Sequence, residues 1–460
     1  MTPHIAVIGG GISGLSAANA LVRDGGDLAD VTVFEGSARV GGILHTTEVA
    51  GLPVDAGADA FLARVPDAER LVRELGLGDS LVAPATSTAH VWVGGRMRPL
   101  PAGTALGVPR SLRSVARSRV LSAGGLARAG LDLVLPGSAY DGDVAVGALV
   151  RRRMGAQVVD RLVDPLLGGV YAGHADALSV EATAPQVATA ARAGRSLMRG
   201  LRGAAADSSP SDGPVFRSLS GGLGRLPQEI AARLGDGVRT ANRVALVERV
   251  GTAWRLTLMG GRALVVDAVV VATPAPVTAK LLRYAAPALS GELAEVETAS
   301  VAIVTFAFPA AALTRAPVGS GFLVPAGQGR LMKACTLSSA KWAHLGGHDV
   351  AIVRCSVGRA GEPPPEDDDE VVARLRSELA DAIGAGVAPT ETRVTRWVDA
   401  LPQYAVGHVD RVARIESALD QLPGLALAGS AYRGVGVPAC IRSGEQAAAR
   451  ILDGLRARRA

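Results

Sequence analysis

The chain has 460 residues, of which 48% are hydrophobic and 3% aromatic, and its formal net charge is +5. This hydrophobic content is enough for a large core, and the length favours two or three domains. The low aromatic content, without basic residues interleaved among aromatic ones, argues against nucleic acid as a partner. Nearly all of the positive charge is arginine, which we attribute mainly to codon usage.

The sequence carries no signal for secretion, membrane insertion or metal binding. Residues 5–8 are too short for the apolar region of a signal peptide. The apolar run at 299–313 is shorter than a membrane-spanning helix and has the composition of a strand. Three cysteines without a CxxC pair argue against a disulfide framework, and the seven histidines show no metal-ligand spacing. We therefore expect a cytoplasmic protein without a bound metal.

A glycine-rich motif stands near the N-terminus between an expected strand and an expected helix. The segment HIAVIGG reads as a buried strand, and residues 13–25 place apolar side chains at helical spacing. Between them lies Gly9-x-Gly11-x-x-Gly14. The first glycine allows a tight turn, the second a close approach of pyrophosphate, and the third close packing of helix on strand. Phosphate would bind at the N-terminus of the helix.

An acidic residue follows at the distance that dinucleotide-binding proteins require. The segment DVTVFEG, residues 30–36, predicts a strand ending in Glu35, about twenty residues after the glycine motif. At this place an acidic side chain binds ribose hydroxyl groups. The two features predict a dinucleotide site and leave the choice between NAD and FAD open.

Both ends of the chain resemble the monoamine oxidase-like flavoproteins. A second glycine pair, Gly41–Gly42, follows the acidic residue, and the segment VDAGADAFLA (54–63) matches a loop that those proteins place against the flavin. Residues 423–452 predict a strand, a turn at Gly429 and an amphipathic helix. The resemblance implies that this helix directs its positive end at the flavin ring and that the cofactor is FAD.

The middle of the chain changes from a helical to a mixed pattern. Residues 84–210 have helical periodicity, and residues 203–214 are expected to form a loop. An amphipathic helix at 215–235 leads into the later elements. These are strands at 238–258, 263–274, 299–309, 321–325, 330–336 and 350–357, a helix at 369–384, and a strand near 392–404.

These segments predict a chain of two fold types, α/β and α+β. A Rossmann-like FAD domain of the monoamine oxidase type is assembled from residues 1–83, 211–290 and 395–460. A helical insert, residues 84–210, forms a substrate or membrane-surface domain, and residues 291–394 form a mixed β-sheet substrate domain. Four arginines of the insert form either a solvated face or a surface for anionic lipid: Arg110, Arg113, Arg117 and Arg119.

Four further segments resemble the protoporphyrinogen/coproporphyrinogen oxidase family. They are DPLLGGVYAGHADALSV (164–180), FRSLSGGLGRLP (216–227), RWVDALPQYAVGH (396–408) and YRGVGVPACIRSG (432–444). The similarity runs from end to end, and amine oxidases lack GGVYAG and ALPQYAVGH. The resemblance implies an oxygen-dependent FAD oxidase of haem biosynthesis that oxidises a porphyrinogen to a porphyrin and releases hydrogen peroxide.

Within this family, the sequence favours coproporphyrinogen III over protoporphyrinogen IX. The arginine-rich chain is similar to actinobacterial members, which are thought to oxidise coproporphyrinogen III. Animal and plant members carry a propionate-binding arginine at the place where this chain has Ala89, next to His90. Propionate binding is therefore unassigned, and four arginines stay open as candidates: Arg39, Arg64, Arg96 and Arg98.

The resemblance also implies site residues. For FAD these are Gly9, Gly10, Gly11, Ile12, Ser13, Gly14, Glu35, Gly36, Arg39, Gly42, Ile43, Gly57, Ala58, Asp59, Ala60, Val244, Trp397, Gly429, Val435, Gly436 and Val437. For the substrate they are Gly168, Gly169, Ala172, Gly321 and Leu323, which would enclose the tetrapyrrole between apolar walls. Cys440 is interpreted as a buried small residue rather than a covalent flavin attachment. No catalytic residue is assigned, because aromatisation of the product can drive the step without a strong base.

Other functions stay open at this point. A flavin amine oxidase would need a lysine near the flavin, which only Lys280, Lys333 or Lys341 could supply. A non-catalytic prenyl-binding protein, similar to Rab escort proteins and GDP-dissociation inhibitors, would lack an intact flavin site. Contact with a membrane surface and transfer of the product to a downstream haem-pathway enzyme are further alternatives that the sequence leaves open.

Overall fold

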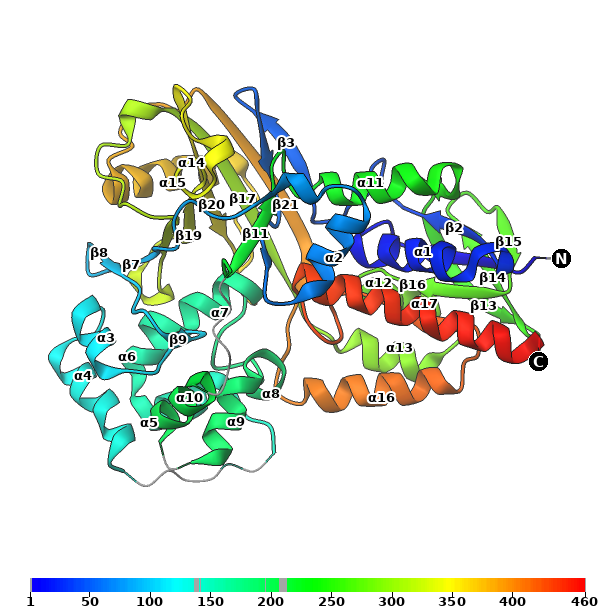
Figure 1. Cartoon of the computed structure of the whole chain (residues 1–460), viewed down its shortest axis with the longest axis horizontal. Helices are drawn as coiled ribbons and strands as arrows, with labels where there is room; N and C mark the ends of the chain where they lie inside the picture. The colour runs from blue at the N-terminus through cyan, green and yellow to red at the C-terminus, as the bar shows by residue number, and fades with distance from the viewer. Residues whose placement is uncertain (1, 136–139, 141, 195, 207–212, 460) are drawn as a thin grey trace.

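The computed structural model describes residues 2–135, 140, 142–194, 196–206 and 213–459. Figure 1 shows three regions: a sheet covered by long helices at the right, a second sheet at the upper left, and a group of helices at the lower left. The chain passes more than once between the two sheets. The region around the sheet covered by long helices is therefore assembled from segments far apart in sequence.

The first sheet is parallel and has five strands. Its strands, in spatial order, are β12 (Val238–Arg239), β2 (Asp30–Phe34), β1 (His4–Ile8), β16 (Ala268–Val271) and β22 (Leu425–Leu427). In β1 both faces are apolar, since Ile5 and Val7 belong to one core and Ala6 and Ile8 to another. A parallel sheet with both faces covered requires such strands.

Different elements cover the two faces of this sheet. One face carries α1 (Ile12–Gly25), α2 (Pro66–Glu74), α11 (Arg225–Leu234) and α17 (Val437–Arg459). The other carries α12 (Ala275–Leu282), α13 (Pro287–Ala294), α16 (His408–Asp420) and the three-stranded sheet β13 (Val244–Val250), β14 (Ala253–Leu258) and β15 (Ala263–Val266).

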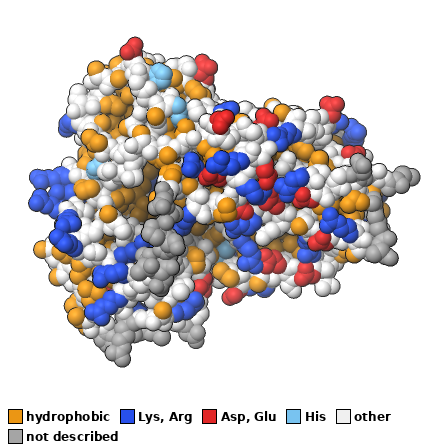
Figure 2. Space-filling model, viewed as in Figure 1, with side chains coloured by type: hydrophobic (Ala, Val, Ile, Leu, Met, Phe, Trp, Pro, Cys, Tyr) orange, Lys and Arg blue, Asp and Glu red, His pale blue; other side chains and the backbone are white. Residues whose placement is uncertain are grey.

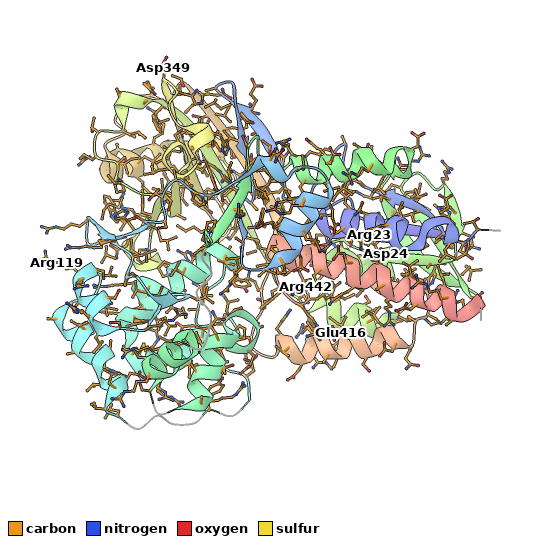
Figure 3. All side chains as sticks on the ribbon, in the orientation of Figure 1. Arg23, Asp24, Arg119, Asp349, Glu416 and Arg442 are labelled. Carbon is orange, nitrogen blue, oxygen red and sulfur yellow. The ribbon has the colours of Figure 1, made fainter. Side chains whose placement is uncertain are left out.

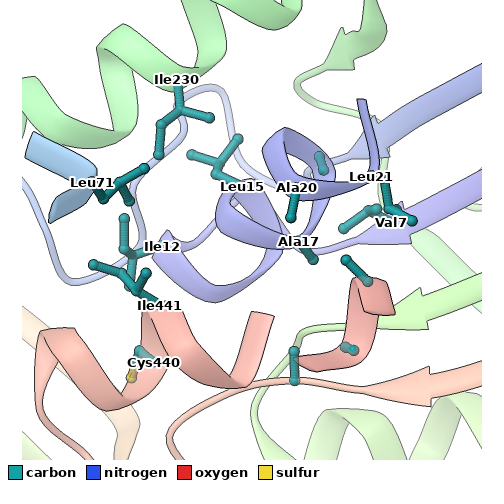
Figure 4. Packing of buried hydrophobic residues seen from close by; sticks show 14 of the residues in the cluster. Val7, Ile12, Leu15, Ala17, Ala20, Leu21, Leu71, Ile230, Cys440 and Ile441 are labelled. Carbon is teal, nitrogen blue, oxygen red and sulfur yellow. The ribbon is translucent and has the colours of Figure 1, made fainter. Parts of the chain in front are cut away.

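The first and last helices of the chain pack against each other. Figure 1 shows α1 and α17 side by side, and in Figure 4 Ile12 of α1 lies next to Ile441 of α17. Their approach is close because Gly444 has no side chain: a Cβ there would lie 2.2 Å from the Ser13 carbonyl oxygen. Arg442 of α17, labelled in Figure 3, forms an ion pair with Asp67 of α2. The glycine turn at the N-terminus and the start of α17 are therefore neighbours.

The second sheet has seven strands and is mostly antiparallel. In spatial order they are β21 (Glu391–Pro402), β17 (Thr298–Pro309), β20 (Val350–Val357), β19 (Met332–Leu337), β18 (Gly321–Leu323), β7 (His90–Val93) and β8 (Arg96–Pro99). Alternate residues of β17, among them Val304 and Phe306, pack with helix α15 (Asp368–Ile383). The strands and helix expected between 299 and 404 are confirmed. Strands β7 and β8, however, lie in this sheet, although the helical insert was predicted to begin at residue 84.

The helical insert has its own core, which includes Leu149, Leu162, Leu167 and Met198. Its helices are α3 (Leu112–Ser118), α4 (Ala123–Gly130), α5 (Val146–Met154), α6 (Ala156–Val158), α7 (Asp164–Tyr171), α8 (Val180–Thr183), α9 (Pro185–Ala193) and α10 (Leu197–Ala206), with a π-helical turn at Val159–Val163 before α7. Of the loop expected at 203–214, residues 203–206 belong to α10 and residues 207–212 lie outside the described residues. Lys and Arg side chains gather over β8 and α3 (Figure 2), and Arg119 lies at this edge in Figure 3.

Short strands complete the fold. They are β3 (Thr46–Val49) with β4 (Leu52–Asp55), β9 (Thr104–Ala105) with β10 (Val108–Pro109), and β11 (Phe216–Leu219) between β5 (Phe61–Leu62) and β6 (Leu81–Val82); helix α14 (Ser338–Lys341) follows β19. Of the helices built from described residues, none is both long and apolar enough to cross a bilayer.

Candidate active site

A cavity of about 490 Å³ lies between the two sheets, at the carboxyl ends of β1, β16 and β22. In the first sheet the chain leaves β1 toward β2 on one side, whereas β16 pairs with β1 on the other. Ligands of open α/β sheets bind at such a point, outside the carboxyl ends of the strands. Val301 and Ile303 of β17 and Leu401 of β21 supply the opposite wall. The cavity therefore brings together both ends of the chain and the second sheet.

The glycine turn after β1 has the geometry that the sequence predicted. Gly9 adopts a φ of +109°, and its N–H donates to the Phe34 carbonyl oxygen at the end of β2. A Cβ at Gly14 would lie 1.9 Å from the Gly9 carbonyl oxygen, so Gly14 is required for packing. A Cβ at Gly11 would meet no atom within 4 Å, and Gly11 precedes the first residue of α1. The turn is thus open at the helix N-terminus, where a pyrophosphate can approach the backbone.

The carboxylate of Glu35 is held beside this turn. Its Oε2 accepts from the Gly10 N–H at 2.7 Å, and its Oε1 accepts from the Ser37 N–H at 2.7 Å. The Glu35 side chain is not among the groups that line the cavity, and it lies on the β2 side of the turn. Val244, the first residue of β13, is buried in the same core cluster as Phe34 of β2.

The loop between β2 and β3 and the loop between β4 and β5 form the next part of the cavity wall. Gly42, Ile43, Gly57, Ala58 and Ala60 line it. The loops touch so closely that a Cβ at Gly57 would lie 2.0 Å from the Ile43 carbonyl oxygen. This contact explains why glycine occupies position 57, where any side chain would separate the loops.

Asp59 lies in the same loop but differs from its expected placement. Its carboxylate accepts from Lys341 Nζ at 2.9 Å and lies 3.3 Å from the Arg354 guanidinium, away from the cavity. Burial by itself would raise the pKa of Asp59, but the positive charges of Lys341 and Arg354 outweigh it and lower the pKa to about 2. The side chain thus links the loop to Arg354 of the second sheet. A local sequence pattern could not have predicted these ion pairs, because both partners of Asp59 are at least 282 residues away in the chain.

Arg39 and Trp397 meet at the edge of the cavity. The Arg39 guanidinium donates to the Gly42 carbonyl oxygen at 3.0 Å and lies 5.7 Å from the centre of the Trp397 ring. Trp397 lines the cavity and donates from its indole N–H to the Ala56 carbonyl oxygen at 3.0 Å. The tryptophan therefore joins β21 of the second sheet to the loop after β4.

The last part of the wall comes from the C-terminal strand, turn and helix. Gly429 follows β22 with a φ of +139°, and its N–H donates to the Ser443 hydroxyl at 3.0 Å. Val435, Gly436 and Val437 line the cavity at the start of α17. A 23-residue helix that starts at the cavity places its positive end there.

Cys440, one turn into α17, also lines the cavity. It is a free cysteine, and burial raises the pKa of its thiol to about 11. At neutral pH the thiol is protonated, and a protonated thiol is a poor nucleophile. The interpretation of Cys440 as a buried small residue stays a prediction, and this pKa supports it.

Of the five predicted substrate residues, one lines the cavity. Gly169 of α7 lines it, and a Cβ at Gly169 would lie 3.8 Å from Leu323 Cδ2. The other four are outside its lining. Gly321 is closed in by the Cys335 carbonyl oxygen, Ala172 packs with Ala299 and Val301, and Gly168 lies against the Arg359 guanidinium.

Sequence reasoning missed several residues that line the cavity, notably Val301, Ile303 and Ser356, and it named Lys333 only for the amine oxidase alternative. The alternation of residues in the strands could have separated one face of each strand from the other. It could not have shown which face is turned to the cavity. Among the described residues that line the cavity, none of the four candidate propionate arginines is found. Arg64 and Arg96 are exposed.

Comparisons with known proteins agree with this geometry. Residues 12–452 match the family model described as flavin containing amine oxidoreductase. A coproporphyrinogen III oxidase from Mycobacterium tuberculosis is 39% identical, with 99% of each chain covered, and one from Bacillus subtilis is 33% identical, with 96% of this chain and 97% of the relative covered. A solved structure assigned to protoporphyrinogen oxidase from Exiguobacterium is 31% identical, has a TM-score of 0.87, and covers 98% of this chain and 99% of its own.

Proposed function

Because the chain belongs to the flavin-containing amine oxidoreductase family, we propose that it is an FAD-dependent oxidase that converts coproporphyrinogen III to coproporphyrin III with molecular oxygen and releases hydrogen peroxide. The relatives named coproporphyrinogen III oxidase include one from Mycobacterium leprae that is 40% identical over 98% of both chains. A bovine relative named protoporphyrinogen oxidase is 31% identical. The observation that carries the proposal is that one cavity is lined by the N-terminal glycine turn, the start of α17 and the second sheet.

The residues around the cavity fit FAD. The open backbone at Gly11 and the N-terminus of α1 would hold the pyrophosphate, and Glu35 would hold ribose hydroxyls. Val435, Gly436 and Val437 would hold the flavin ring at the positive end of α17. When bound, the flavin supplies the redox chemistry by accepting a hydride from the substrate and passing electrons to oxygen.

The protein's own contribution is binding, orientation and exclusion of water. Gly169 of α7 and Val301 and Ile303 of β17 give the cavity an apolar wall. Such a wall suits the largely apolar macrocycle of a porphyrinogen, which it would hold in one orientation by packing. Small residues such as Gly169 keep this wall open to a large ring.

The test is the formation of porphyrin by the purified protein. We expect a flavin absorbance spectrum and, in air, porphyrin fluorescence that rises faster with coproporphyrinogen III than with protoporphyrinogen IX at matched concentration. Hydrogen peroxide should form with the porphyrin, and anaerobic samples should stop after the bound flavin is reduced. A clear preference for protoporphyrinogen IX would overturn the choice of substrate. Turnover of amines without porphyrin formation would overturn the proposal as a whole.

We also infer a cytoplasmic location, which the three free, buried cysteines support. The exposed arginines Arg113, Arg117 and Arg119 near α3 support contact with an anionic surface such as a membrane. Transfer of the product to a downstream haem-pathway enzyme stays a prediction.

A further inference from the structure

A second cavity, of about 290 Å³, adjoins the first, and Lys333 lines both. Four basic residues line this smaller cavity: Arg330, Lys333, Arg359 and Arg374. Glu362 is the acidic residue among those that line it, and its side chain is mostly exposed. The smaller cavity therefore carries an excess of positive charge beside the apolar one.

A β-bulge directs Lys333 to the boundary between the two cavities. The register of β19 against β20 shifts there, because Met332 pairs with Val357 whereas Ala334 pairs with Ser356. Lys333 is the extra residue of this bulge. Bulges are often found next to active sites, where they change the direction of a side chain.

The ammonium group of Lys333 is buried and incompletely paired. The residue is 5% exposed, and Nζ donates to the Gly358 carbonyl oxygen at 2.8 Å. An ammonium has three N–H donors, and no second acceptor for Nζ is found among the described residues, so two donors can serve a ligand. Burial, together with the nearby charge of Arg359, lowers the pKa of Lys333 to about 7. An anion in the cavity would favour the charged form.

Arg359, 6% exposed, is a second buried cation next to Lys333. Its Nη2 donates to the Val324 carbonyl oxygen at 3.2 Å, whereas Nη1 has no hydrogen-bond partner among the described residues. The nearest carboxylate oxygen to Nη1 is Oδ2 of Asp164, at 3.7 Å, which is beyond hydrogen-bond distance. A buried guanidinium with an unpaired N–H is costly unless a ligand completes its contacts.

The other two basic residues already have acidic partners. Arg330 pairs with Asp381, and Arg374 pairs with Glu370 four residues earlier on α15. Among the described residues, Lys333 is thus the basic residue of this cavity without a carboxylate partner, and Arg359 has its partner Asp164 only at 3.7 Å. Carboxylates form strong charge-assisted hydrogen bonds with both lysine and arginine.

We propose that Lys333 and Arg359 bind an ionised carboxylate of the substrate, so that one propionate arm extends from the apolar cavity into the smaller one. This inference rests on the proposed function and deepens it. Coproporphyrinogen III has propionates at two positions where protoporphyrinogen IX has vinyl groups. Where the bound arm is one of these two propionates, a vinyl group in its place would leave the Lys333 ammonium without a carboxylate and Arg359 with only the Asp164 carboxylate at 3.7 Å, and such a loss discriminates between substrates. The pair therefore selects the substrate richer in carboxylates.

The experiment compares binding of coproporphyrin III and of its tetramethyl ester, which has the same ring without ionised carboxylates. The variants Lys333→Met and Arg359→Met remove each charge, and Lys280→Met and Arg376→Met are matched controls on exposed helical positions outside both cavities. Binding is measured by porphyrin fluorescence somewhat below pH 7, where Lys333 is charged. Flavin content is measured on every sample.

We expect each of the two buried-charge variants to raise the dissociation constant for coproporphyrin III about tenfold or more, which is typical of losing a hydrogen bond to a charged group. Binding of the ester should change little, and the control variants should bind both porphyrins as the wild type does. Lys333→Arg, which keeps the charge, should retain most of the affinity for the acid.

Equal loss of acid and ester binding would mean that these side chains act by packing, and it would overturn the inference. Unchanged binding of coproporphyrin III in both Met variants would overturn it too. If a Met variant does not fold, Lys333→Arg provides the test. Because this variant keeps the positive charge, a charge-dependent subsite predicts that it still binds coproporphyrin III more tightly than the tetramethyl ester, and equal affinity for the two would overturn the inference. Failure of the proposed function is a separate result: the flavin-containing wild type would then form no porphyrin.

Discussion

At the scale of single residues, two glycines of one motif have different tasks. Gly14 is packed against backbone, and a Cβ there would lie 1.9 Å from the Gly9 carbonyl oxygen. Gly11 has φ and ψ angles of −72° and 174°, which any residue adopts, and a Cβ there would meet open space. The protein fold therefore requires glycine at position 14 but not at position 11, and the proposed pyrophosphate at the helix N-terminus would account for Gly11.

Alanine substitutions separate these two tasks. Gly14→Ala should destabilise the protein by about 1–3 kcal/mol, since the new methyl group overlaps the backbone. Gly11→Ala should change the free energy of unfolding by less than about 1 kcal/mol but should greatly reduce the flavin bound per chain. Urea unfolding and flavin absorbance of the purified variants test both statements. Full flavin content in Gly11→Ala would contradict the proposed pyrophosphate position.

At the scale of elements, the contact between α1 and α17 builds two walls of the large cavity, where we propose that the cofactor binds. Each helix begins at the cavity, and Gly444 allows the two to approach within backbone contact. Since the first follows β1 and the second follows β22, their packing also sets the distance between two cavity walls. A change that separates the helices should therefore affect flavin binding as well as stability.

Gly444→Ala is expected to separate them. Its methyl group would lie 2.2 Å from the Ser13 carbonyl oxygen, so we expect a loss of about 1–3 kcal/mol in unfolding free energy and weaker retention of flavin. Gly454→Ala, on the same helix but in open space, is the matched control and should be neutral or stabilising by up to about 1 kcal/mol. Calorimetry and flavin release on dilution measure the two effects. Similar behaviour of the two variants would show that the helix contact tolerates displacement.

At the scale of the whole molecule, the second sheet holds one of the loops that line the large cavity, the proposed cofactor site. Trp397 of β21 donates to the Ala56 carbonyl oxygen, and Arg354 of β20 donates to the Gly57 carbonyl oxygen at 2.5 Å. Asp59 adds the ion pair with Lys341. The first two contacts connect residues 56 and 57 to strands of the second sheet, and the third connects Asp59 to helix α14 next to it, so the two parts of the molecule should unfold together.

The Asp59 contact predicts a pH-dependent contribution to stability. Its pKa of about 2 in the folded protein lies below the ordinary value of 3.8, so the stabilisation is present above pH 3.8 and is lost as the pH falls through 3.8 toward 2. At neutral pH, Asp59→Asn should cost about 2 kcal/mol in the free energy of unfolding. The difference from the wild type should shrink near pH 3. Urea unfolding at both pH values measures it, and a difference independent of pH would refute the role of the carboxylate charge.

The sequence alone determined the elements that depend on local chemistry. The strand, turn and helix around Gly9–Gly14, the position of Glu35 at the end of β2, and the long strands and helix between 298 and 402 follow from periodicity and glycine geometry, which a short segment contains in full. The family resemblance extended these elements to a flavin site, and 13 of the 21 proposed cofactor residues line the large cavity.

Tertiary structure decided what depends on distant segments. Only the fold places α1 against α17, turns Asp59 toward Lys341, and adds β7 and β8 to the second sheet. The meeting of Lys333 and Arg359 likewise depends on a register shift between two strands, and no pattern within either strand encodes it. The backbone hydrogen bonds of a helix or turn join residues close together in the chain, so a short segment can predict them. Ion pairs and the lining of a cavity depend instead on which distant segments pack together.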